Sequence, residues 1–370
     1  MTHLRHAILF LVIPALASGC GASESASGGA GTGGGGAGGV GGAPDGAGGR
    51  EPVVAPTLPW PITEFPELPD VAVDVPEARI ALGNLLFFDP VLSVDSETAC
   101  GTCHSEFWGM SDGIPRGIGH GAGPAAGPGR TGPNVSRRNS LALFNLAFRE
   151  TLLWDGRSDS LEEQAVLPLL EAVELDLDPE TAAQRVAAIP EYVELFADAF
   201  PEDPRVTIDN IAAAIAAFER TLLSNRSIYD AYVKGHGTFD EELIDAMFKF
   251  AQMGCSGCHA PPLFESETFA DRNVPGIEGI EDEGLAEVSG LPEDVGKFRT
   301  PSLRNATVTE PYFHNGSVET LEEAIRHELV QSGMSFSEED VRLIERFIGE
   351  GLRDESRASE RPRSVPSGLQ

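Results

Sequence analysis

Apolar residues in the middle of the chain recur at the spacing of an α-helix. Ile211, Ile215, Phe218 and Leu222 fall at positions i, i+4, i+7 and i+11, which places them on one helical face. No segment alternates apolar and polar residues over the length that a half-buried strand needs. The pattern therefore predicts an all-α fold.

Helix starts and loops are also marked in the sequence. Residues 160–163 and 320–323 both read Ser/Thr-Leu-Glu-Glu, a capping box in which the first hydroxyl and the last carboxylate satisfy backbone N–H groups. Another helix is expected to start at Asp178, because a proline follows it at the first helical position. Glycine and proline crowd residues 113–134 and 272–292, which are predicted to be loops.

The two ends of the chain differ from its centre. Residues 1–20 combine Arg5 and an apolar stretch with Cys20, which lies in the setting of a bacterial lipoprotein cleavage box and would be lipidated. An ordinary secretory signal with a chance cysteine is the alternative, and both predict export. Residues 21–50 are almost entirely Gly, Ala and Ser and are expected to be a flexible tether. Residues 356–370 are expected to form a disordered tail.

The charge of the chain restricts its partners. The 370 residues carry 26 Lys and Arg against 58 Asp and Glu, a net charge of −32, and residues 1–50 contribute none of it. The excess acid therefore lies on the folded part, which argues against nucleic acid and anionic membrane surfaces as partners. No apolar run reaches the roughly 20 residues of a spanning helix, so the lipid anchor is the only membrane contact expected.

A C-x-x-C-H motif occurs twice and carries most of the chemical information. Two thiols at this spacing can form thioethers to the two vinyl groups of one haem, and the adjacent imidazole then ligates the iron. A redox dithiol would sit in a βαβ context that the pattern lacks, and a zinc site would leave both histidines without a role. The sequence therefore predicts two covalently bound haems c. The motifs supply the thiols of Cys100, Cys103, Cys255 and Cys258 and the imidazoles of His104 and His259.

Two haems imply two cytochrome c-like domains, each carrying one, which we place at residues 51–235 and 236–355. The length of the chain suits two domains of ordinary size. Its 3 Trp and 4 Tyr are few for two cores, so the porphyrins would act as the large flat apolar groups. No repeat of short period is visible, and the haem motif is the one feature recognised twice.

Short blocks of sequence surround the haem motifs in a definite order. They are LGNLLFFDP at 82–90, LWDGR at 153–157, SLEEQA at 160–165, RTPSLRN at 299–305, PYFHNG at 311–316 and TLEE at 320–323. With the two haem motifs they resemble the bacterial di-haem cytochrome c peroxidase family, which also contains MauG-type enzymes. The resemblance implies a peroxide-binding N-terminal haem and a C-terminal haem that stores and relays electrons.

The resemblance assigns roles around the first haem. His104 is implied as its proximal ligand, and His120, in a glycine-rich loop, matches the distal histidine that caps the iron at rest and leaves on activation. Gln164 and Glu174 keep the spacing of the family's distal pocket. There, a carboxylate moves a proton between the peroxide oxygens and an amide orders bound peroxide. Trp154 matches the indole that lies between the two haems.

At the second haem the sequence departs from the family pattern. His259 matches the proximal ligand, but Val318 stands where the family has a Met or Tyr as distal ligand, and Val cannot ligate iron. Met334, His327 or Glu319 could substitute, or the position could be open. Thioether ligation favours a high reduction potential, and an anionic or missing ligand favours a lower one.

The resemblance carries further expectations about ions, assembly and location. Asn139 and the backbone carbonyls of Arg299 and Pro301 fall where the family binds a calcium ion between the domains, and hard oxygen donors suit that ion. Family peroxidases are often dimers, so a homodimer is an expectation here. With an exported, lipidated chain, we expect a periplasmic protein anchored to a bacterial membrane, favouring the outer membrane.

Three functions fit these features. The preferred one is an enzyme, a di-haem peroxidase that reduces hydrogen peroxide to water with electrons from a small donor such as cytochrome c, attracted by the acidic surface. The second is a MauG-like oxidase acting on a partner protein or small molecule through Trp154; His120 argues against it, because MauG-type sites usually lack that histidine. The third is a di-haem electron-transfer protein without peroxide chemistry, and the spacing of Gln164 and Glu174 argues against it.

Overall fold

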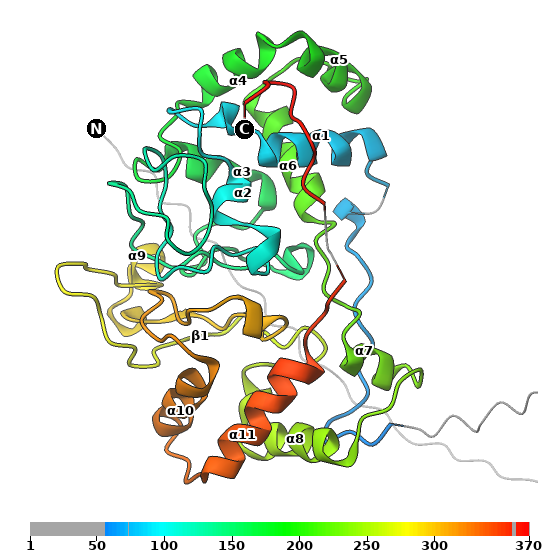
Figure 1. Ribbon diagram of the computed structural model, residues 1–370, viewed down its shortest axis with the longest axis vertical. Coiled ribbons are helices and arrows are strands. Elements are labelled where there is room, and N and C mark those ends of the chain that lie inside the picture. Colours follow the sequence, from blue (N-terminus) through cyan, green and yellow to red (C-terminus); the bar gives the residue numbers. More distant parts are fainter. Residues whose placement is uncertain (1–55, 73, 357–359, 370) are drawn as a thin grey trace, which may run out of the picture. The chain divides into compact units, whose positions relative to one another are not determined.

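Helices dominate the structure, a computed structural model that describes residues 56–72, 74–356 and 360–369 (Figure 1). The only strands among these residues are Phe269–Ala270 (β1) and Phe298–Arg299 (β2), which pair antiparallel. The predicted dominance of helices is thus confirmed. No helix in the described ranges is both long and apolar enough to cross a membrane. The predicted signal segment 1–20 with Cys20 and the tether 21–50 lie outside the described residues.

The helices begin where the sequence predicts them to begin. Thr320 closes a full capping box with Glu323, Ser160 accepts a hydrogen bond from the Glu163 N–H, and Asp178 caps the helix that starts with proline. The α-helices are α1 (Glu77–Phe88), α2 (Cys100–Cys103), α3 (Leu161–Leu170), α4 (Pro179–Ala187), α5 (Pro190–Ala199), α6 (Ile208–Glu219), α7 (Ile228–Val233), α8 (Glu241–Gln252), α9 (Ala286–Ser289), α10 (Leu321–Gln331) and α11 (Glu338–Arg346). Apart from α9, the two predicted loops hold no α-helix.

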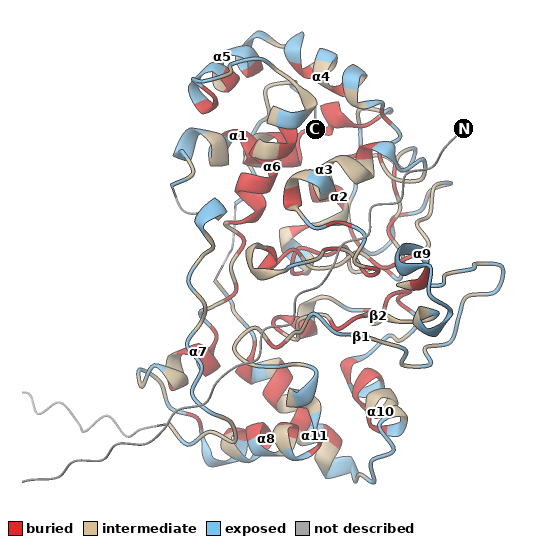
Figure 2. Cartoon of the chain, turned by 180° about the vertical axis from the view of Figure 1, so that it is seen from behind, coloured by how far each residue is buried: buried red, intermediate tan, exposed pale blue. Residues whose placement is uncertain are grey.

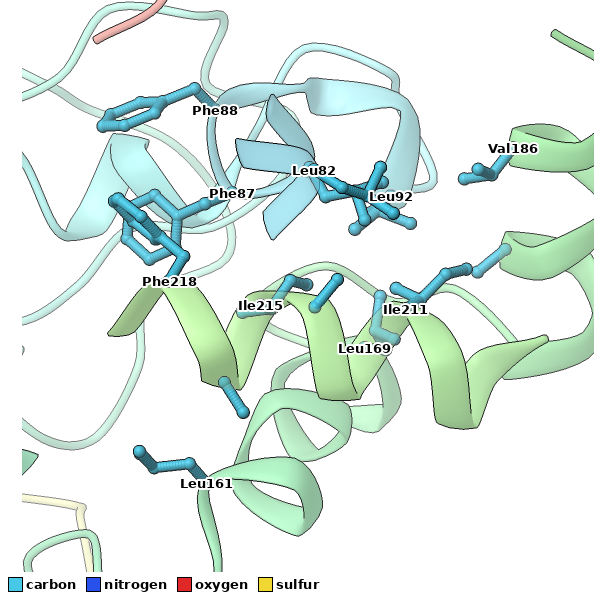
Figure 3. Packing of buried hydrophobic residues seen from close by; sticks show 14 of the residues in the cluster. Leu82, Phe87, Phe88, Leu92, Leu161, Leu169, Val186, Ile211, Ile215 and Phe218 are labelled. Atoms are coloured by element: carbon cyan, nitrogen blue, oxygen red, sulfur yellow. The ribbon is translucent and has the colours of Figure 1, made fainter. Parts of the chain in front are cut away.

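The first hydrophobic core forms where α1 crosses α6 (Figure 3). The face of α6 that the sequence predicts is buried, and Ile211, Ile215 and Phe218 pack against apolar residues of α1 and α3 (Figure 2). At the crossing, a Cβ added to Gly83 would lie 1.9 Å from the carbonyl oxygen of Ala214. A glycine is therefore required for the two helices to approach this closely.

The second hydrophobic core lies between α8, α10 and α11. Its centre is aromatic, with Phe250, Phe264 and Phe347 in mutual edge or tilted contact. Trp60 and Tyr229 also pack in this core, although the predicted limits place both in the N-terminal domain. The division between the two cores thus falls before Tyr229 rather than at residue 235, and the segment near residue 60 runs with the second core.

The backbone of residues 145–160 is repeated by residues 305–320, so that each residue corresponds to the one 160 positions later (305 − 145 = 160). In both copies an asparagine with positive φ precedes a 3-10 turn, a backbone hydrogen bond of 2.7 Å closes a tight loop, and a Ser or Thr then caps a helix, α3 or α10. The paired residues are Asn145 and Asn305, Leu152 and Tyr312, Trp154 and His314, Gly156 and Gly316, Ser158 and Val318, and Ser160 and Thr320. The sequence analysis missed this repeat because few side chains are shared.

The end of the chain packs on the first half instead of forming a disordered tail. Arg361 donates a hydrogen bond to the Gly101 carbonyl at 3.0 Å, and Ser367 donates one to the Asp89 carboxylate at 2.6 Å. Figure 1 shows this segment leaving α11 and running to the side of α1 and α6. The prediction of disorder is wrong for residues 360–369, because polar residues with little apolar surface can still order on a surface that offers them partners.

A buried ion pair stabilises the second half. Arg304 and Asp230 are almost fully buried and share two hydrogen bonds of 2.8 and 2.7 Å, and the guanidinium also donates to the Pro262 carbonyl. Removing one partner of such a pair leaves an uncompensated charge in the interior.

We therefore expect Asp230→Ala to lower the free energy of unfolding by about 3–5 kcal/mol, measured by urea denaturation of the holoprotein. Asp203→Ala is the matched control, because Asp203 pairs with Arg205 at the surface and its loss should give no resolvable change. Equal effects of the two substitutions would contradict the role given to the buried pair.

Candidate functional site

The histidines of the two C-x-x-C-H motifs are held in the same way. His104 Nδ1 lies 3.2 Å from the Met110 carbonyl, and His259 Nδ1 lies 3.0 Å from the Pro301 carbonyl and 3.3 Å from that of Phe264. A carbonyl only accepts, so Nδ1 carries the proton in both rings and Nε2 keeps its lone pair. Burial lowers the pKa of both imidazoles, which keeps them neutral. Each ring is prepared to ligate a metal through Nε2.

The four motif cysteines are free thiols in this structure. Burial raises the pKa of Cys100 and of Cys255 to about 12 and raises that of Cys103 further. Thiols in such surroundings stay protonated and unreactive, unlike the thiolates of redox dithiols. The environment therefore fits cysteines that serve as points of attachment.

The second motif opens into a cavity of about 500 Å³. Cys255, Cys258 and His259 line it, and most of the rest of its wall is apolar, including Phe250, Ile325 and Leu329. Side chains normally fill an interior to crystal-like density, so a void of this size requires an occupant. An apolar wall with two thiols and one imidazole fits a covalently attached haem.

Two side-chain oxygens in the first half of the chain, Gln164 Oε1 and Glu219 Oε2, are buried without a hydrogen-bond partner among the described residues. The Glu219 carboxyl lies near the first motif, because its charge contributes to the raised pKa of Cys100. Burial raises the pKa of Glu219 itself to about 8. Buried polar atoms without a partner indicate that water or another polar group binds next to them.

Glu174 acts electrostatically on the cysteines of the first motif, and its assigned role stays a prediction. Its charge contributes to the raised pKa of both Cys100 and Cys103. Burial and, after it, the charge of Glu171 raise the pKa of Glu174 to about 7 against the opposing effect of Arg157. This carboxyl can therefore either donate or accept a proton near neutral pH.

His120 and Glu174 come together through their backbones. The His120 N–H donates to the Glu174 carbonyl at 2.8 Å, and a Cβ on Gly119 would lie 2.1 Å from the Val173 carbonyl oxygen. Only a glycine at position 119 permits this contact between the two loops. His120 Nε2 lies 2.9 Å from the side-chain amide nitrogen of Asn134 and 3.1 Å from the Ala172 carbonyl, so this nitrogen already has partners. Ligation of iron by Nε2 would require the ring to leave that carbonyl.

Trp154 is buried where the two halves of the chain meet. Its indole Nε1 donates to the Asn139 carbonyl at 2.9 Å, and the Asn139 N–H donates to the His314 carbonyl at 2.7 Å. The Arg299 N–H donates to the Trp154 carbonyl at 2.9 Å. Trp154 also lines the cavity of the second motif. The structure thus brings Trp154 together with two of the residues expected at the calcium site.

All three residues expected to bind calcium line that same cavity: Asn139, Arg299 and Pro301. The Pro301 carbonyl accepts the hydrogen bond from His259, and the Asn139 side-chain nitrogen donates to the Ile114 carbonyl. No three His, Cys, Asp or Glu side chains gather into a metal site in the described ranges. A calcium ion here would depend on carbonyl and amide oxygens, and the site stays a prediction.

The candidates for the distal ligand of the second haem are placed differently from one another. Met334 lines the cavity, whereas Val318, Glu319 and His327 do not. The sequence analysis missed Glu328, which does line the cavity. An acidic residue on a helix of an acidic chain gives no signal by itself, so only the fold identifies it.

Comparisons with known proteins agree with this geometry. The sequence pattern of the family described as di-haem cytochrome c peroxidase matches residues 77–238. Cytochrome c551 peroxidase of Pseudomonas aeruginosa is 34% identical over 286 residues, which cover 74% of this chain and 78% of that protein. Methylamine utilization protein MauG of Methylorubrum extorquens is also 34% identical, over 67% of this chain and 68% of that protein.

Solved structures give the same result. The crystal structure of a MauG-like protein associated with microbial copper homeostasis superposes with a TM-score of 0.68 at 28% identity, covering 82% of this chain and 98% of that one. The chain belongs to the di-haem cytochrome c peroxidase family, a family of haem-containing oxidoreductases, and the resemblance seen in the sequence is confirmed. Relatives named as peroxidases and relatives named as MauG are equally similar to it.

Proposed function

We propose that this protein is an exported di-haem peroxidase that reduces hydrogen peroxide to water with electrons from a small donor protein. The observation that carries the proposal is Glu174, a buried carboxyl with a pKa raised to about 7, whose charge acts on Cys100 and Cys103 of the first motif. An electron-transfer site has no need of a proton-transferring carboxyl near its iron.

In this proposal each domain carries one haem, attached at Cys100 and Cys103 in the first and at Cys255 and Cys258 in the second. When bound, haem supplies iron that binds peroxide and exchanges electrons. His104 and His259 hold the two irons through Nε2, because their Nδ1 protons are committed to backbone carbonyls.

Glu174, Gln164 and His120 are the residues proposed to act on peroxide at the first haem. Ionised Glu174 would take the proton from the inner oxygen of peroxide and hold it for the outer oxygen, while the haem, when bound, would supply the two electrons for cleavage that the donor then replaces. Gln164 orients bound peroxide through its free side-chain oxygen, which accepts a hydrogen bond. His120 must stay clear of the iron during this step, and its bond to the Ala172 carbonyl provides a place for the displaced ring.

Trp154 is the residue proposed to carry electrons between the two halves. It lines the cavity of the second motif, and the Asn139 peptide connects it by hydrogen bonds to the His314 carbonyl. With haems held by His259 and His104, Trp154 would lie on the route that electrons from the donor take from the second haem to the first. A donor with a basic surface suits a chain of net charge −32. Export through residues 1–20, anchoring at Cys20, a periplasmic location, a homodimer and a bound calcium ion complete the proposal.

A MauG-like oxidase is the second candidate function. The engagement of His120 with the Ala172 carbonyl favours it, because such an enzyme needs a first iron that the histidine does not cap. In that case Trp154 would pass oxidising equivalents from the first haem outward to a partner protein or small molecule.

The haem content of the protein tests the attachment. We expect two covalent haems per chain in the wild type and one in Cys258→Ala/Cys255→Ala, measured by mass spectrometry and by the haemochrome spectrum of the denatured protein. Met253→Leu is the matched control, since Met253 lines the same cavity without a role in attachment, and it should retain both haems. Two haems in the double cysteine variant would contradict attachment at the second motif.

The pH dependence of the peroxide reaction tests Glu174. Because Glu174 acts as a base, the rate should rise with pH through an apparent pKa of about 7. Glu174→Gln should remove this limb and lower the rate by roughly 10²- to 10⁴-fold, measured by stopped-flow mixing with peroxide. Glu171→Gln is the matched control. It should keep the rate but move the limb to lower pH, because the charge of Glu171 raises the pKa of Glu174. An unchanged profile in Glu174→Gln would contradict the assignment.

The function itself is tested by adding one electron equivalent, then hydrogen peroxide and a reduced small cytochrome. We expect half-reduction to make the first haem high-spin and peroxide then to drive oxidation of the cytochrome, followed by absorption spectroscopy. Half-reduced protein that ignores peroxide would support the electron-transfer alternative. Reaction of the fully oxidised protein with peroxide, without oxidation of the cytochrome, would support the MauG-like alternative.

A further inference from the structure

The cavity beside the second C-x-x-C-H motif is lined by a carboxylate that the proposed function does not use. Glu328 lies on α10 and lines the cavity together with His259 and Cys255. Its charge reaches both residues. Burial raises the pKa of Cys255 and Glu328 adds to that rise, while at His259 the charge of Glu328 opposes the lowering caused by burial. A negative charge that acts on the thiol and on the imidazole lies close to the place where the haem iron would be held.

The other candidates for a ligand at this place are engaged elsewhere. His327 donates from Nε2 to the Arg272 carbonyl at 2.7 Å, and its ring packs against the edge of Phe313. The Val318 carbonyl accepts the Tyr312 N–H, and neither Val318 nor Glu319 lines the cavity. Met334 lines the cavity from beyond the end of α10 and is about as exposed as the Glu328 side chain, at 37% against 38%, so exposure does not separate the two and the substitutions below do.

One carboxylate oxygen of Glu328 is hydrogen-bonded, and the other has no hydrogen-bond partner among the described residues. Oε2 accepts a hydrogen bond from Arg272 Nε at 2.8 Å and forms an ion pair with Arg272 Nη2 at 2.7 Å, whereas Oε1 accepts no hydrogen bond from any residue that the structure describes. The Arg272 guanidinium is itself tied to α10 by bonds to the Glu328 carbonyl and to Ser332 Oγ. A ligating carboxylate commonly has its second oxygen oriented by a hydrogen bond of this kind.

We propose that Glu328, through Oε1, is the second protein ligand of the iron that His259 holds, with Arg272 as its positioning residue. This inference rests on the proposed attachment of haem at Cys255 and Cys258. An anionic oxygen ligand stabilises ferric over ferrous iron, so it lowers the reduction potential below that of a thioether-ligated haem. The second haem would then require a more strongly reducing donor than a methionine-ligated haem does.

Substitutions at position 328 of the holoprotein test the ligand directly. Glu328→Gln should change the ferric electron paramagnetic resonance signal of the second haem and raise its reduction potential, measured by spectroelectrochemistry. Glu328→Met should convert that haem to a low-spin form with the charge-transfer band of sulfur-ligated ferric haem. Glu322→Gln, an exposed glutamate on the same helix, and Met334→Leu are the controls and should leave both signals unchanged.

The outcomes separate this ligand from the attachment it depends on. Haem content is measured first, and a wild-type protein with one haem per chain would overturn the attachment and the ligand together. With two haems present, a Glu328→Gln spectrum equal to the wild type would overturn ligation alone, even if the potential rises, because a nearby charge acts on the potential without a bond. A change in Met334→Leu with none in Glu328→Gln would assign the position to Met334 and also overturn the proposal.

Discussion

An interior void beside His259 is the constraint on which the second half of this protein depends. The aromatic cluster of Phe250, Phe264 and Phe347 packs behind the motif, and the cavity wall continues along α10. Filling about 500 Å³ with side chains would require several more large residues than the sequence supplies there. A haem, the cofactor of this family, supplies a large apolar surface of the kind that such a cavity fits.

A small set of buried side chains and one peptide connects the two halves. Trp154 and His314 occupy equivalent positions in the two copies of the internal repeat, and they meet edge to face with ring centroids 6.5 Å apart. The Asn139 peptide bonds to both, through its carbonyl to the indole and through its N–H to the histidine carbonyl. Arg138 adds buried ion pairs to Asp155 in the first half and to Asp282 in the second. These contacts connect the two halves through buried groups at one junction.

The sequence predicts the parts of this structure that depend on local chemistry. The haem motifs, the caps at Ser160 and Thr320 and the buried face of α6 all follow from short-range patterns. The features that were missed depend on tertiary contacts. The order of the C-terminal segment comes from partners such as Asp89 and Gly101, far away in sequence. Glu328 reaches the cavity wall because of how α10 packs, which no local pattern in the sequence reveals. The family's ligand position falls instead on Val318, which pairs with Tyr312 in the tight loop before α10.

The repeat shows how one scaffold can yield two different haem environments. Helices α3 and α10 begin with the same cap and the same Leu-Glu-Glu sequence, so their first turns are equivalent. They diverge one residue later, where α3 carries Gln164 and α10 carries Ala324. Further along, Pro168 in α3 corresponds to Glu328 in α10. In the proposed function Gln164 acts on an external ligand of the first haem, and in the further proposal Glu328 gives the second haem a ligand from the protein. These two positions of the helix would then contribute to the difference between the haems, together with Glu174 and His120, which lie outside α3.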